Sequence, residues 1–180
     1  MTRLALAALC VALLAGCGGG GSKTVAHVGA QQITQQQLDA LVQHFRHQAQ
    51  LEGKDFPRDG TKGFVALRNQ LLGLLVYRAE LQQAADRLGV KVDQDAVSQR
   101  LAAAQSGGEQ EGDANGDTYA RDSIESELLK EGIATKVTRT VGGKTAAERA
   151  ARRNRALATY LARLQRETKV RYEPGFAPGS

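Results

Sequence analysis

The chain is poor in cysteine, proline and aromatic residues, and these shortages narrow its class. Its 180 residues include two cysteines, three prolines, four phenylalanines, four tyrosines and no tryptophan. Two cysteines, Cys10 and Cys17, are too few for a disulfide scaffold or a Cys-ligated zinc site, and they do not form a C-x-x-C redox motif. The length suits one domain with its own core, and the abundance of alanine and leucine favours helices.

Hydrophobic runs long enough to cross a membrane are also lacking. The longest unbroken apolar run, Leu4–Leu14, has eleven residues and follows a positive Arg3. As a helix it would measure about 16 Å, whereas the hydrocarbon core of a bilayer is about 30 Å thick. A short apolar run after a basic residue and before small residues predicts a secretory signal peptide.

The four residues that end this segment, Leu14-Ala15-Gly16-Cys17, resemble the bacterial lipobox. The resemblance implies that residues 1–16 are a cleaved lipoprotein signal peptide. Cys17 would then carry covalent diacylglycerol and an N-acyl chain such as palmitate, and residues 17–23 would form a Gly-rich tether. We therefore expect a membrane-anchored lipoprotein of the cell envelope that faces away from the cytoplasm. Ordinary cleavage near Cys17 without lipid is the alternative.

Helical periodicity dominates the rest of the chain. Two capping boxes, Thr34-x-x-Gln37 and Thr145-x-x-Glu148, each predict a helix start, and Gly89 predicts a helix end. The polar, Gly-rich stretch Ser106–Thr118 predicts a loop. The predicted helices cover about residues 34–53, 61–88, 93–105, 121–138 and 145–166.

Two short β segments flank these helices. Thr24–Val28 and Lys169–Tyr172 are strand candidates, and their pairing would bring the chain ends together. The fold class predicted is therefore mainly α: an array of about five helices with a minimal two-strand element. The domain is expected to cover residues 24–176, with residues 177–180 as a disordered tail.

The order of these motifs resembles the N-terminal chaperone domain of the SurA/PrsA family of extracytoplasmic folding factors. That family opens Val-Ala-x-Val-Asn-Gly-x-x-Ile-Thr, where this chain runs from Val25-Ala26 to Ile33-Thr34 with Gly29-Ala30 in place of Asn-Gly. The end of the long helix, Leu88-Gly89-Val90-Lys91-Val92-Asp93, is similar too. The resemblance implies an ATP-independent chaperone that binds unfolded exported polypeptides.

One departure from the family concerns catalysis. Its members often insert a parvulin-type prolyl isomerase domain before the last helix, where this chain has just Val141-Gly142-Gly143-Lys144. No such domain fits there, so we expect no enzymatic activity and no catalytic residue. Two alternatives stay open: an envelope adaptor that recruits one specific partner, or an isomerase relative that has lost its catalytic domain.

A groove for hydrophobic segments would need apolar side chains on neighbouring helices. For each residue proposed here, the alternative is that it is an ordinary core residue. The candidates for a shared wall are Phe45, Phe64, Leu67, Leu71 and Leu75.

Charge is unevenly distributed, although the net charge is only +5. Residues 144–171 hold nine basic and two acidic side chains, whereas residues 105–131 hold eight acidic and two basic ones. The two regions could face each other as a solvated helix pair. Alternatively, a basic face on the last helix could contact anionic lipid or acidic clients. Nucleic acid is not an expected partner. The basic face comprises Arg149, Arg152, Arg153 and Arg155.

Metal and cofactor sites are not indicated. His44 and His47 lie three residues apart on a predicted helix, where they could share a metal ion. Two ligands are too few, and no third ligand is placed with them. We therefore expect no metal and no cofactor, and both histidines are expected to face solvent.

Overall fold

The computed structural model describes residues 22–106 and 114–177, which form five helices and three strands. The predicted signal peptide, Cys17 and the last three residues lie outside the described residues. None of the described helices is both long enough and apolar enough to cross a membrane. The elements are β1 (Thr24–Val28), β2 (Gln31–Thr34), α1 (Gln35–Leu51), α2 (Lys62–Leu88), α3 (Gln94–Ser106), α4 (Ala114–Val137), α5 (Ala146–Glu167) and β3 (Val170–Tyr172).

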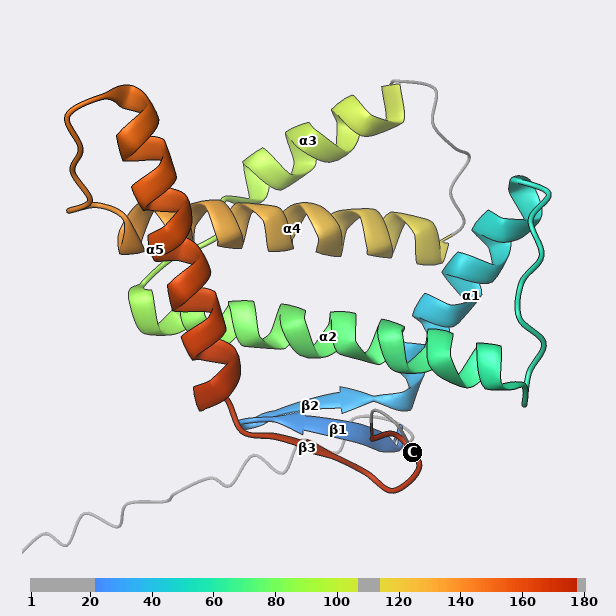
Figure 1. Ribbon diagram of the computed structural model, residues 1–180. Helices are drawn as coiled ribbons and strands as arrows, with labels where there is room; N and C mark the ends of the chain where they lie inside the picture. The colour runs from blue at the N-terminus through green and yellow to red at the C-terminus, as the bar shows by residue number, and fades with distance from the viewer. Residues whose placement is uncertain (1–21, 107–113, 178–180) are drawn as a thin grey trace, which may run out of the picture.

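The chain ends meet in an antiparallel sheet of order β2-β1-β3 (Figure 1). Ala26 pairs with Tyr172 and Val28 pairs with Val170, so the predicted pairing of the two end segments is confirmed. The third strand, β2, was not predicted. Its first two residues, Gln31 and Gln32, are polar, so the segment does not show the alternating apolar pattern of a strand. Gly29 makes the turn between β1 and β2 with a φ of 56°, a conformation that favours glycine.

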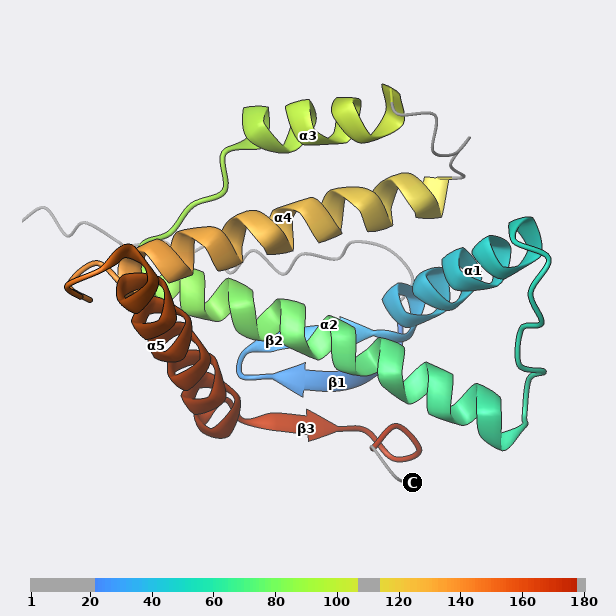
Figure 2. The same cartoon turned by 45° about the horizontal axis from the view of Figure 1, so that its top comes forward.

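α2 is the central helix of the domain. In Figure 1 it lies between the sheet and α4, and in both views α3 lies on the side of α4 away from α2 (Figures 1 and 2). One part of α2 packs against β1 and α1, with Leu72 only 1% exposed. The C-terminal part builds a second core with α4 and α5, formed by Leu81, Ala84, Ala85, Leu129, Ile133 and Leu164. The central position predicted for this helix is thus confirmed.

Helix ends follow the local chemistry of the sequence. Both predicted capping boxes are formed, since the Thr34 and Thr145 hydroxyls each accept a hydrogen bond from a backbone N–H of the first turn. α2 ends at Gly89, which is left-handed with a φ of 63°. These caps satisfy backbone groups that the helices themselves leave unpaired.

The structure corrects one detail of the sequence-based prediction and decides another that it left open. α4 begins at Ala114, so residues 114–118 are helical where a loop was expected. α5 begins with exposed alanines and becomes buried only toward Leu164. Its first half therefore lies at the edge of the domain, which settles a question that alanine alone left open.

Candidate functional site

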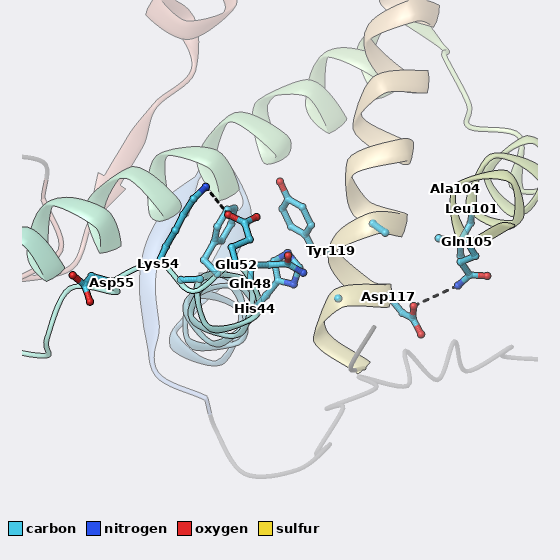
Figure 3. Close-up of a pocket in the computed structure, with 14 residues that line it drawn as sticks. His44, Gln48, Glu52, Lys54, Asp55, Leu101, Ala104, Gln105, Asp117 and Tyr119 are labelled. Atoms are coloured by element: carbon cyan, nitrogen blue, oxygen red, sulfur yellow. Dashed lines mark hydrogen bonds and ion pairs between the residues drawn. The ribbon is translucent and has the colours of Figure 1, made fainter. Parts of the chain in front are cut away.

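A cleft of about 610 Å³ opens between the C-terminal half of α1, the end of α3 and the start of α4 (Figure 3). We call it the aromatic cleft. Its volume falls within the range of about 300–1,000 Å³ that is usual for ligand pockets. Its walls include His44, Phe45 and Ala49 from α1, Leu101, Ala104 and Gln105 from α3, and Asp117, Tyr119 and Ala120 from α4.

Three rings form the apolar wall of the aromatic cleft. His44 stacks on Tyr119 with 4.5 Å between ring centroids, and Phe45 meets Tyr119 edge-on at 5.4 Å. His44 is 7% exposed, so the expectation that it faces solvent is wrong. The imidazole is buried because α4 extends far enough to place Tyr119 over it. Within the described ranges, no three His, Cys, Asp or Glu side chains gather as a metal site.

Arg78 on α2 supports the Tyr119 ring from a second side. Its guanidinium carbon lies 5.2 Å from the ring centroid, and its nitrogens bond the Asp122 carboxylate at 3.1 Å and the Ser123 hydroxyl at 3.0 Å. Burial raises the pKa of Asp122, and the positive charge of Arg78 opposes that rise. These contacts hold the start of α4 on α2, so the ring wall is fixed before any ligand arrives.

The rim of the aromatic cleft is polar. Lys54 pairs with Glu52 at 2.6 Å, and Gln105 donates to the Asp117 carboxylate at 3.4 Å (Figure 3). The hydrogen bond that the Lys54 ammonium donates to Glu52 raises the pKa of Lys54. Asp55 also borders the opening. An apolar floor with a hydrogen-bonding rim suits a polypeptide, which carries apolar side chains on a polar backbone.

The five predicted groove residues do not form one wall of this cleft. Phe45 borders it, whereas Leu71 is 4% exposed and belongs to the core. Leu75 borders a separate, smaller depression beside Arg78. Phe64 and Leu67 pack partly buried against the same core as Leu71. One face of α2 packs against the sheet and α1 over several turns, so most of its apolar stripe is used for folding.

The four predicted basic residues lie exposed on the first half of α5. Arg149 donates to the carbonyl of Gly143 at 3.0 Å, and Arg152 reaches the carbonyl of Gly142 at 3.5 Å. Arg153 borders a second cleft between α4 and α5, and Arg155 is exposed. All four arginines are thus exposed on α5, and a role for them as a binding face stays a prediction.

Sequence reasoning missed Tyr119 and the α3 wall of the aromatic cleft. Tyr119 follows the polar stretch that was predicted to be a loop, so it was not assigned to any helix face. Leu101 was predicted to face inward, and it does so toward the cleft. The spacing of Leu101, Ala104 and Gln105 places these side chains on one helix face, which was the available signal.

The order of strands, the long central helix and the returning β3 agree with the resemblance seen in the sequence. The family model of the SurA-like N-terminal domain matches residues 1–122. The chain belongs to this family. The predicted resemblance is thus confirmed, and a SurA-like N-terminal domain indicates a chaperone-like family. A search of the curated proteins finds no match.

The matched range holds the aromatic cleft but not the whole SurA-like domain. It ends within α4, whereas α5 and β3 complete the second core and the sheet. Residues 138–145, which include the short Val141-Gly142-Gly143-Lys144 junction, connect α4 to α5.

Proposed function

We propose that this SurA-like chain is a membrane-anchored lipoprotein that binds unfolded or hydrophobic polypeptide segments outside the cytoplasm. It would act as a folding chaperone without ATP, cofactor or catalytic step. The observation that carries the proposal is the aromatic cleft in a domain of a chaperone-like family. Unfolded exported chains are the proposed clients.

The shape of the aromatic cleft supports a polypeptide ligand. Tyr119, Phe45 and His44 offer ring faces and edges to an apolar side chain, and aromatic contacts add about 0.5–1.5 kcal/mol beyond the area they bury. Ala104 and Ala120 keep the opposite walls low, which leaves room for a chain to enter. The arrangement resembles the grooves that bind apolar segments by shape rather than by a fixed sequence.

The anchor is the second part of the proposal. The segment Leu14-Ala15-Gly16-Cys17 supports lipidation of Cys17, and residues 18–23 would link the lipid to β1. Intact mass of the membrane-fraction protein tests this part. Cleavage before Cys17 plus the mass of acyl chains is the expected result, and a Cys17→Ser chain should remain unprocessed. A soluble chain that retains Met1 would overturn it.

Aggregation of a reduced, denatured model client tests the cleft. Ala104→Trp places a large side chain in the aromatic cleft from an exposed position on α3, whereas Ala103→Trp adds the same side chain to the same helix outside the cleft. We expect the native chain and Ala103→Trp to suppress light scattering without nucleotide, and Ala104→Trp to lose most of this effect.

Two results would contradict the chaperone proposal. One is no suppression by the native chain at several-fold excess over the client, and the other is equal suppression by both tryptophan variants. A single stoichiometric, salt-sensitive partner in a pull-down would instead support the envelope adaptor. Catalysed X-Pro isomerisation by the purified chain would overturn the proposal that it is not an enzyme.

A further inference from the structure

A cluster of positive charge covers the end of the domain where α4 passes into α5. Seven basic residues fall within residues 136–155, and every one of them is exposed. The single acidic residue in this range, Glu148, accepts hydrogen bonds from the backbone N–H groups of Lys144 and Thr145 as a helix cap. We call this surface the basic end; it comprises Lys136, Arg139, Lys144, Arg149, Arg152, Arg153 and Arg155.

The acidic side chains of α4 do not neutralise the basic end. Asp122 pairs with Arg78 on α2, and Glu127 and Glu131 pair with Arg100 on α3. Across the described residues, no ion pair joins α4 to α5. The ion pairs expected if the acidic and basic regions packed together as a helix pair are therefore not formed among the described residues. The basic side chains at the start of α5 are exposed to solvent instead.

The basic end also contains a shaped recess. A cleft of about 490 Å³ lies between α4 and α5, with Arg139 from one side and Arg153 from the other. Ala134 and Leu157 form apolar parts of its wall, and the Asn154 amide is a further hydrogen-bond donor at its edge. Guanidinium groups bind phosphate oxygens through paired N–H donors, which gives them geometric preference for phosphate.

We propose that the basic end binds the phosphodiester headgroups of anionic phospholipid and seats the domain against the bilayer. The inference rests on the anchored form of the proposed function. Six residues, 18–23, separate Cys17 from β1, and such a tether spans at most about 20 Å when fully extended. A lipid on Cys17 would therefore hold the domain near the membrane surface, where headgroups are the most abundant phosphates.

Electrostatics and the recess act together at this surface. Positive charge within a Debye length of about 8 Å is attracted to an anionic membrane, and each basic residue there strengthens association by about fivefold. Arg139 and Arg153 would clamp one headgroup phosphate, while Arg155 and Lys144 would contact its neighbours. The aromatic cleft lies at the opposite end of α4. It would therefore stay open to clients when the basic end is bound to the membrane.

A fluorescent probe on α5 tests the contact in the full-length processed chain. Ala151 is exposed beside Arg152, and an Ala151→Cys chain acylated at Cys17 has that one thiol free for an environment-sensitive dye. The labelled protein is reconstituted on phosphatidylcholine vesicles with and without phosphatidylglycerol. A dye at Gln50→Cys, an exposed position near the end of α1, is the control.

We expect the Ala151 dye to shift its emission on phosphatidylglycerol vesicles only, and the Gln50 dye to stay unchanged on both. Salt of 1 M, where the Debye length is about 3 Å, should abolish the shift. Arg139→Gln combined with Arg149→Gln, Arg153→Gln and Arg155→Gln should also abolish it. Removing four exposed charges elsewhere should not; this control combines Lys23→Gln, Arg58→Gln, Lys62→Gln and Arg171→Gln.

Each other outcome overturns the proposal. An Ala151 dye that does not respond, that responds equally on neutral vesicles, or that responds after loss of the four arginines shows that the basic end is not a headgroup site. A shift produced by soluble polyglutamate but not by vesicles assigns the surface to an acidic polypeptide. Sedimentation with neutral vesicles reports the lipid anchor separately, and client aggregation reports the cleft separately.

Discussion

Gly132 of α4 lies directly against Val90, which follows Gly89, the residue that caps the end of α2. A Cβ at position 132 would be 2.5 Å from Cγ1 of Val90, closer than side chains approach in folded proteins. The sequence alone predicts that a glycine here weakens α4. The structure shows what the glycine permits, because its missing side chain lets the chain between α2 and α3 pack onto the α4 backbone.

We therefore expect Gly132→Ala to destabilise the domain. Alanine should strengthen the helix by about 1 kcal/mol, but the clash with Val90 should cost about 1–3 kcal/mol, so the expected net change is a loss of up to about 2 kcal/mol. Urea unfolding followed by circular dichroism measures the difference. Gly73→Ala is the matched control, because nothing lies within 4 Å of a Cβ at that helical position. It should stabilise α2 by about 0.5–1 kcal/mol.

Relief of the clash gives a second check on the same contact. In a chain that also carries Val90→Ala, the Gly132→Ala substitution should cost less than it does alone, since neighbouring changes are coupled. If Gly132→Ala were as favourable as Gly73→Ala, the close approach would be contradicted.

Glu80 on α2 is a buried carboxyl, only 4% exposed, and burial raises its pKa. Burial also raises the pKa values of Tyr77 and Tyr172, and the negative charge of Glu80 adds to both. Between the unfolded pKa of about 4.3 and the higher folded value, the native state binds more protons than the unfolded state. Stability is therefore lost as pH rises through this window.

The expected effect of Glu80→Gln follows from this loss of stability as pH rises. The substitution removes a buried charge, so the melting temperature should rise at neutral pH, and the gain should vanish near pH 4, where the native carboxyl is protonated. Thermal melts at the two pH values measure it. Glu127→Gln, which changes a carboxylate with 70% side-chain exposure, should have little effect at either pH. A gain that persists unchanged at pH 4 would contradict the role of the charge.

Local chemistry made the helices predictable. Thr34 and Thr145 start helices through side-chain hydrogen bonds within four residues, and Gly89 ends one through its own backbone, so these signals need no tertiary partner. Where tertiary packing determines the position of a helix end, the sequence was a poorer guide. Residues 114–118 include polar residues and a glycine, yet they are helical, and the helix they begin packs against α1.

The candidate site depended on such packing. The apolar stripe of α2 correctly indicated buried contacts, but periodicity could not tell a core-facing stripe from a groove, and Leu71 is core. Tyr119 became a site residue only because α1 and α2 approach it from two sides, with His44 stacked on it and Arg78 over its ring. By contrast, the exposure of the four α5 arginines was predictable, since charged side chains on the polar side of a helix need no tertiary partner.

The last prediction concerns the end of the family match at residue 122, within α4. Truncation after Asp122 should leave a chain that does not fold cooperatively. It would remove Leu129, Ile133 and Leu164, which cover Leu81, Ala84 and Ala85 of α2, and it would leave β1 without β3. Loss of one buried leucine alone usually costs about 2–5 kcal/mol, comparable with much of the stability of a small domain.

Circular dichroism melts and amide exchange of the truncated and full chains, compared with a chain that ends at Ala177, provide the measurement. A sharp melting transition in the chain that ends at Asp122 would show that α1, α2 and α3 form a domain of their own. We expect such a transition only when α5 and β3 are present, because β3 pairs with the first strand and α5 closes the second core.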